Sequence, residues 1–137
     1  MTTLLTELAI ALSLLSASLS ASPAVASTTP VVVIPPQNAY YVAKCEPYRH
    51  LLALYPWNVE TALAVCGAES GGYAAAHGDT TLTPSSWGLF QIRALEGRPP
   101  PEELRNPVVS VREAHKLWLN AGGFKKDWTV CGKKVVC

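Results

Sequence analysis

The amino-acid sequence predicts a single α-rich domain with a smaller non-helical part. Three segments place apolar residues at helical spacing, whereas residues 73–101 carry a polar loop, a short apolar run and a proline cluster. A length of 137 residues suits one domain. The 11 Lys+Arg against 10 Asp+Glu give a net charge of +1, which argues against a partner bound through bulk charge, so we expect no nucleic-acid partner.

Residues 1–26 have the features of a signal peptide. The apolar run Leu8–Leu19 is followed by Ala24-Val25-Ala26, a small-x-small pattern typical of signal-peptidase sites. The first seven residues contain no Lys or Arg and end in Glu7, so an uncleaved anchor is the alternative. We expect a secreted or cell-wall-associated protein that contacts the membrane only through this segment.

Residues 27–39 are rich in Thr, Val and Pro, and Pro30, Pro35 and Pro36 disfavour a helix. The composition predicts an extended leader, and the alternative is an edge strand over Val31–Ile34. The folded domain is then expected over residues 40–137.

Four cysteines in an exported chain of this size indicate two disulfides. Three pairings are possible, of which Cys45–Cys66 with Cys131–Cys137 is the most local and is the one we predict. Zinc is the rival interpretation, but the sequence has no Cys-x-x-Cys and no histidine within a few residues of a cysteine. We therefore expect neither a metal nor another cofactor.

The first two helices are predicted over residues 47–55 and 59–70. Pro47 suits a first turn, and Pro56 ends that helix. Asn58 is the expected N-cap of the second helix, and Gly71-Gly72 its C-terminal stop. The third helix is predicted from Ser110, which has capping-box spacing to Glu113, up to Gly122-Gly123.

Glu69 is the most informative residue, because it comes at the C-terminal end of the apolar second helix. The negative end of the helix dipole and nearby apolar groups both disfavour its anion, so we expect a raised pKa. A carboxylic acid that keeps its proton near neutrality can act as a general acid. The alternative is a solvated glutamate without function.

Several motifs occur in a characteristic order around Glu69. Glu69-Ser70-Gly71-Gly72 precedes residues 86–92 (Ser-Trp-Gly-Leu-Phe-Gln-Ile), then Asn106-Pro107 leads into a helix, and Gly122-Gly123-Phe124 precedes Trp128. This order resembles the lysozyme-like superfamily, in particular domains of the soluble lytic transglycosylase (SLT) type, over roughly residues 41–131. The resemblance implies an α-rich α+β fold: a lysozyme-like helical domain with a small irregular or β lobe and a substrate cleft.

The resemblance also implies roles for individual residues. Glu69 matches the catalytic acid that protonates the β-1,4 bond between N-acetylmuramic acid and N-acetylglucosamine, and Ser70 matches its neighbour. The tyrosine–asparagine motif of larger members is absent, and Tyr73 is the candidate to replace its tyrosine. The other expected substrate-binding residues line the cleft or flank it: Asp79, Gly88, Phe90, Gln91 and Trp128.

Two reactions are compatible with this pattern. The one we favour is a single-glutamate lytic transglycosylase, in which Glu69 also deprotonates the muramoyl 6-hydroxyl and the product is a 1,6-anhydro sugar. The alternative is a muramidase that hydrolyses the same bond with Asp79 as second carboxylate. A non-catalytic glycan- or partner-binding module and a small secreted interaction protein are the rivals from other classes. Peptidoglycan glycan strands are the expected partner, and we expect a monomer.

Overall fold

The structure is a computed structural model that describes residues 18–137. The chain divides into two units, Met1–Val31 and Val32–Cys137. Most of the predicted signal peptide lies outside the described residues, and residues 18–31 are exposed without regular secondary structure. Among the helices of the described part, none is long and apolar enough to cross a membrane.

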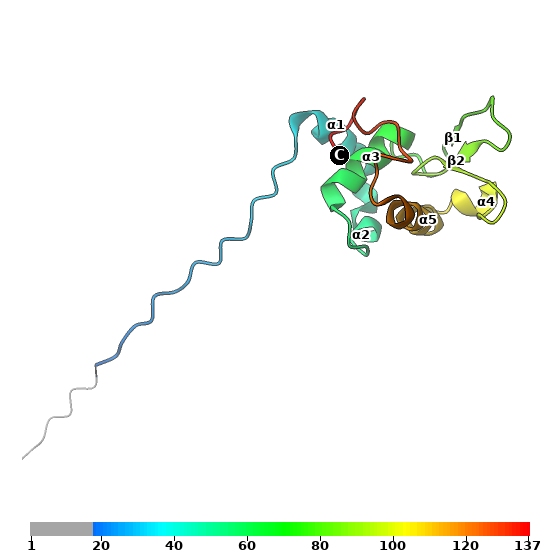
Figure 1. Cartoon of the computed structure of the whole chain (residues 1–137). Coiled ribbons are helices and arrows are strands. Elements are labelled where there is room, and N and C mark those ends of the chain that lie inside the picture. Colours follow the sequence, from blue (N-terminus) through cyan, green and yellow to red (C-terminus); the bar gives the residue numbers. More distant parts are fainter. Residues whose placement is uncertain (1–17) are drawn as a thin grey trace, which may run out of the picture. The chain divides into compact units, whose positions relative to one another are not determined.

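The second unit is helical with a small sheet, as Figure 1 shows. Its helices are α1 (Pro36–Cys45), α2 (Arg49–Leu52), α3 (Val59–Ser70), α4 (Pro101–Leu104) and α5 (Pro107–Ala121), with a 3-10 turn at Glu46–Tyr48. The strands β1 (His77–Gly78), β2 (Ser86–Trp87) and β3 (Ile92–Arg93) form an antiparallel sheet in that order. The α-rich α+β class predicted from the sequence is confirmed.

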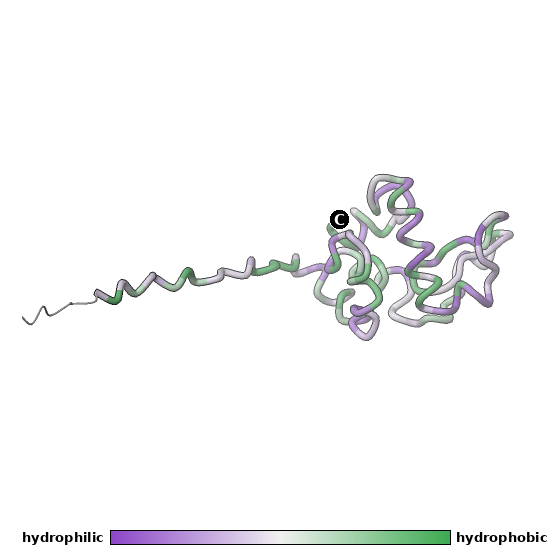
Figure 2. Tube along the Cα trace, turned by 90° about the horizontal axis from the view of Figure 1, so that it is seen from below, coloured by the Kyte–Doolittle hydropathy of each residue, from purple (hydrophilic) through white to green (hydrophobic). Residues whose placement is uncertain are grey.

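Helix α3 is the buried centre of the unit, and its bounds are those predicted. The Asn58 side chain accepts a hydrogen bond from the Thr61 amide, and Gly71 ends the helix in the left-handed conformation. Residues 62–67 are all buried. Hydrophobic and hydrophilic stretches alternate along the folded unit in Figure 2, as expected of elements that turn one side to a common core.

Helix α1 is an element that the sequence analysis missed, because we expected residues 27–39 to be extended. The helix begins at Pro36, where the missing proline N–H costs nothing since the first turn has no intrahelical acceptor. The alternative edge strand over Val31–Ile34 does not form. Packing against α3 stabilises α1, because Gly67 leaves room for the Tyr41 carbonyl and the Cys45–Cys66 disulfide joins the two helices.

The ends of two other helices differ from the predictions. The first predicted helix is only a 3-10 turn followed by α2, which ends at Leu52 rather than at Tyr55. Helix α5 begins at Pro107 rather than at Ser110, since Asn106 caps it by accepting from the Val108 amide. Ser110 is therefore inside the helix, and Glu113 pairs with Lys116 instead of closing a capping box.

The second disulfide, Cys131–Cys137, closes the C-terminal loop, so both bridges follow the most local pairing. Val135 is fully buried within this loop. The Asn38 side chain donates to the Val136 carbonyl and accepts from its amide, both at 2.9 Å, and thereby fastens the loop to α1.

Candidate active site

Glu69 lies in the last turn of α3 and is partly buried. Its pKa is raised to about 7, chiefly by burial and also by the nearby Asp79 carboxylate, while the Lys134 ammonium acts in the opposite direction. No hydrogen bond joins the Glu69 carboxyl to another group in residues 18–137. A carboxyl with this raised pKa keeps its proton closer to neutral pH than an ordinary glutamate does, and no protein group within the described residues takes that proton in a hydrogen bond.

Asp79 is the second carboxylate of this site, and the small sheet positions it. It follows β1 with a φ of 51°, a left-handed conformation that aspartate tolerates better than most residues. The Ser86 hydroxyl of β2 donates to Asp79 Oδ2 at 2.5 Å, beside the paired residues Gly78 and Ser86. The negative charge that acts on Glu69 is thus held in place by the hairpin.

Lys134 is the second charged group that acts on Glu69, and it is not among the site residues predicted from the sequence. It belongs to the C-terminal loop that the Cys131–Cys137 disulfide closes, and its own amide donates to the Val130 carbonyl at 2.8 Å. The backbone at Lys134 is therefore restrained by the disulfide, by this hydrogen bond and by the burial of the neighbouring Val135. No local signal in the sequence relates position 134 to position 69.

Gln91 supports the sheet and has no hydrogen bond to Glu69 in the part of the chain that the structure describes. Its side-chain amide donates to the carbonyls of Ala76 and Gly88, at 3.2 and 2.9 Å. The Oε1 atom of the Gln91 side chain occupies the space that a side chain at Gly78 would need. Gln91 therefore joins the loop before β1 to the turn before β3.

The structure places three of the predicted substrate-binding residues in the core or against the protein backbone. Phe90 is fully buried, and Trp128 is 3% exposed and donates its indole N–H to the Phe90 carbonyl, so both rings belong to the core. Gly88 has a φ of 81° and faces the Leu104 carbonyl and the Ser110 side chain. Its missing side chain admits protein backbone rather than a sugar ring.

Ser70 and Tyr73 flank Glu69 with different accessibility. The Ser70 hydroxyl donates to the Cys66 carbonyl at 2.9 Å and accepts from the Gly72 amide at 3.2 Å, so it closes the helix end. Tyr73 is 67% exposed, which leaves its ring available to a ligand near the end of α3.

Trp87 of β2 contacts the rings or charged groups of two other side chains, His77 and Arg105. The His77 ring stacks on it at 3.6 Å between centroids, and the Arg105 guanidinium lies 4.4 Å from its ring. Two partners thus already stack on this indole, and the arrangement connects the hairpin to the segment between α4 and α5.

A family model described as a lysozyme-like domain matches residues 53–129. The chain belongs to the lysozyme-like domain family. The match spans α3, the sheet, α4 and α5, and it includes both Glu69 and Asp79. Searches of curated proteins and of solved structures found no match.

Membership of the lysozyme-like domain family indicates a role in glycan cleavage related to peptidoglycan. Together with the two disulfides, it also indicates an extracytoplasmic location. Helix α1 and Lys134 lie outside the matched residues, so this chain completes its lysozyme-like domain with segments from both sides of the match.

Proposed function

We propose that this protein cleaves the β-1,4 bond between N-acetylmuramic acid and N-acetylglucosamine in peptidoglycan, with Glu69 as general acid. The observation that carries the proposal is a partly buried carboxyl with a pKa of about 7 beside a second carboxylate. A carboxyl group with this pKa is protonated often enough at neutral pH to donate to a glycosidic oxygen.

The proton transfer needs no cofactor. Glu69 gives its proton to the bridging oxygen as the bond to the anomeric carbon breaks, and positive charge develops on the sugar ring. The carboxylate left on Glu69 then lies near that charge. Lys134 disfavours the protonated acid but stabilises the anion that forms when the proton leaves.

Two candidate reactions can complete the cleavage. The single-glutamate transglycosylase returns the proton to Glu69 from the muramoyl 6-hydroxyl and needs no second carboxylate. A specific observation supports hydrolysis as the second candidate: Asp79 is close enough to act on the charge of Glu69, and Ser86 holds it there. Glycosidases that hydrolyse their substrate use such a pair of carboxylates.

The test of cleavage is the loss of turbidity of purified cell walls. We expect Glu69→Gln to lose roughly a hundredfold or more of the activity, on the order of a removed general acid. The matched control is Glu96→Gln, because Glu96 is exposed and carries the same charge. Equal clearing by the Glu69→Gln variant and the parent would refute the proposal.

Mass spectrometry of the released fragments separates the two reactions. Anhydro ends with little effect of Asp79→Asn identify the transglycosylase. Reducing ends together with a large loss in Asp79→Asn identify the hydrolase with Asp79 as its second carboxylate.

We also propose that residues 1–26 direct export and are removed, which leaves a leader before the domain. Supporting this are the apolar run and the small-x-small pattern ending at Ala26. N-terminal sequencing of the exported protein should then begin at Ser27. A mature protein that retains Met1 would contradict cleavage.

A further inference from the structure

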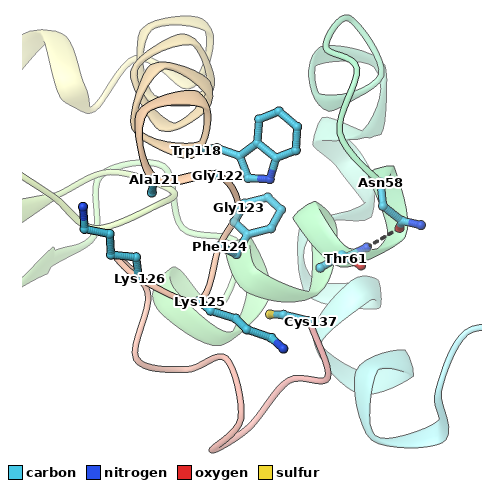
Figure 3. Close-up of a pocket in the computed structure, with 10 residues that line it drawn as sticks. All are labelled: Asn58, Thr61, Trp118, Ala121, Gly122, Gly123, Phe124, Lys125, Lys126 and Cys137. Carbon is cyan, nitrogen blue, oxygen red and sulfur yellow. Dashed lines mark hydrogen bonds between the residues drawn. The ribbon is translucent and has the colours of Figure 1, made fainter.

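A pocket of about 470 Å³ lies at the other end of α3 from Glu69 (Figure 3). This volume is within the range of small-molecule sites, about 300–1,000 Å³. The pocket lies between the start of α3, the end of α5 and the C-terminal loop. Its lining residues are Asn58, Thr61, Trp118, Ala121, Gly122, Gly123, Phe124, Lys125, Lys126 and Cys137.

The lining combines an aromatic surface with a polar wall. Figure 3 shows the Trp118 indole and the Phe124 ring from the α5 side facing Asn58 and Thr61 across the pocket. Phe124 is buried, whereas Trp118 is only partly buried and keeps accessible surface. The Trp118 ring thus packs against the core and also offers accessible surface to the pocket.

The charged side chains that line the pocket are of one sign, since both are lysines. Lys125 and Lys126 are exposed and form no ion pair with any residue in the described range 18–137. No acidic side chain is among the described residues that line the pocket. An anionic group beside an apolar ring is the ligand chemistry that complements such a surface.

We propose that this pocket is a second glycan-binding site, which takes a peptide-bearing muramoyl residue of peptidoglycan with its sugar ring against Trp118 and separate carboxylates of its stem peptide toward Lys125 and Lys126, whose side chains extend in different directions (Figure 3). The apolar face of a pyranose ring packs well against an indole, and the stem peptide supplies carboxylates. A glycan of N-acetylglucosamine alone offers the ring but no anion. The two lysines therefore favour the peptide-bearing polymer over an uncharged one.

The inference rests on the proposed function for its choice of ligand, but it concerns another place on the molecule. Thr61 and Glu69 are eight positions apart on one helix, which separates them by about 12 Å along its axis at 1.5 Å per residue. A site at this distance holds the strand without taking part in bond cleavage. Occupation of both sites by one polymer would raise its effective concentration at Glu69.

The test uses the full chain with Glu69→Gln, so that the ligand is bound and not cut. The probe is a soluble disaccharide–pentapeptide muropeptide, and the matched probe is an uncharged N-acetylglucosamine oligomer. Nuclear magnetic resonance reads the pocket directly through the Trp118 indole N–H, assigned with Trp118→Phe. The amides of Gly122 and Gly123 report on the same pocket if that variant does not fold.

We expect the muropeptide to shift these signals more strongly than the uncharged oligomer. Lys125→Gln and Lys126→Gln should each weaken the muropeptide affinity of the pocket by roughly tenfold, the value of a charge-assisted hydrogen bond. Lys133→Gln removes the same charge from an exposed lysine outside the pocket lining and should leave that affinity unchanged.

Two outcomes would overturn the inference. One is a muropeptide that leaves the pocket signals unmoved, and the other is an affinity for the pocket that neither lysine variant changes. The proposed function fails on a different measurement: the parent protein would not cleave cell walls. That result is independent of whether the pocket binds the muropeptide.

Discussion

The raised pKa of Glu69 should make this residue a source of instability at high pH. The pKa is 4.5 for an ordinary glutamate and about 7 in the folded protein. Each pKa unit corresponds to about 1.4 kcal/mol, so the ionisation of Glu69 lowers the free energy of unfolding by about 3 kcal/mol. Because the folded pKa is the higher one, this stability is fully present below pH 4.5 and is lost as the pH rises through 7.

Glu69→Gln keeps the shape of the protonated acid and cannot ionise. We therefore expect the variant to exceed the parent in free energy of unfolding by up to about 3 kcal/mol at about pH 8 and to differ little at about pH 4. Urea unfolding followed by tryptophan fluorescence, with both disulfides intact, measures the difference at each pH.

Glu96→Gln is the control, because Glu96 is exposed and its replacement should change the free energy of unfolding equally little at both pH values. A Glu69→Gln difference that is the same at low and at high pH would refute the reasoning. In that case Glu69 would titrate as an ordinary solvated glutamate, and its suitability as a general acid would be lost with it.

Three further predictions test the site and the fold. Asp79→Asn should lower the pKa of Glu69, since it removes a negative charge that raises this pKa; carboxyl ¹³C resonances measure the shift. Asn106→Ala should lower the free energy of unfolding by about 1 kcal/mol, which is typical for the loss of an N-cap. Ser110→Ala should lower it little, because no group in residues 18–137 forms a hydrogen bond with the buried Ser110 hydroxyl. Gly67→Ala should cost about 3 kcal/mol or more, since its methyl group would meet the α1 backbone.

Each of these predictions has an outcome that contradicts it. An unchanged Glu69 titration in Asp79→Asn would show that the two carboxylates are not coupled. A larger loss in Ser110→Ala than in Asn106→Ala would restore Ser110 as the cap. For Gly67→Ala, the control is Gly97→Ala, which meets no atom within 4 Å and carries only the strain of a φ of 80°. Equal losses in the two glycine variants would argue against close packing of α1 on α3.

Features with local causes could be predicted from the sequence. Asn58 and Gly71 set the two ends of α3, because a cap and a left-handed stop act within a few residues. The disulfides also follow the shortest separations, 21 and 6 residues. Glu69 could be singled out since its place at the end of an apolar helix is itself a local property.

Features that depend on contacts between distant segments were decided only by the tertiary structure. Helix α1 begins with a proline and is stabilised by packing on α3, so its own composition favoured an extended chain. Phe90 and Trp128 have the sequence context of ligand-binding aromatics, but the fold places both in the core. Asp79 and Lys134 act on Glu69 from segments 10 and 65 positions further along the chain.

The physical reason for this division is the range of the interactions involved. Helix ends depend on hydrogen bonds between neighbours in the sequence, and one sequence carries that information directly. Burial and electrostatic coupling depend on which surfaces pack together, which no single segment specifies. In this protein the acid could therefore be recognised from its own helix, while its charged neighbours and the aromatic pocket at the far end of that helix emerged only once the chain was folded.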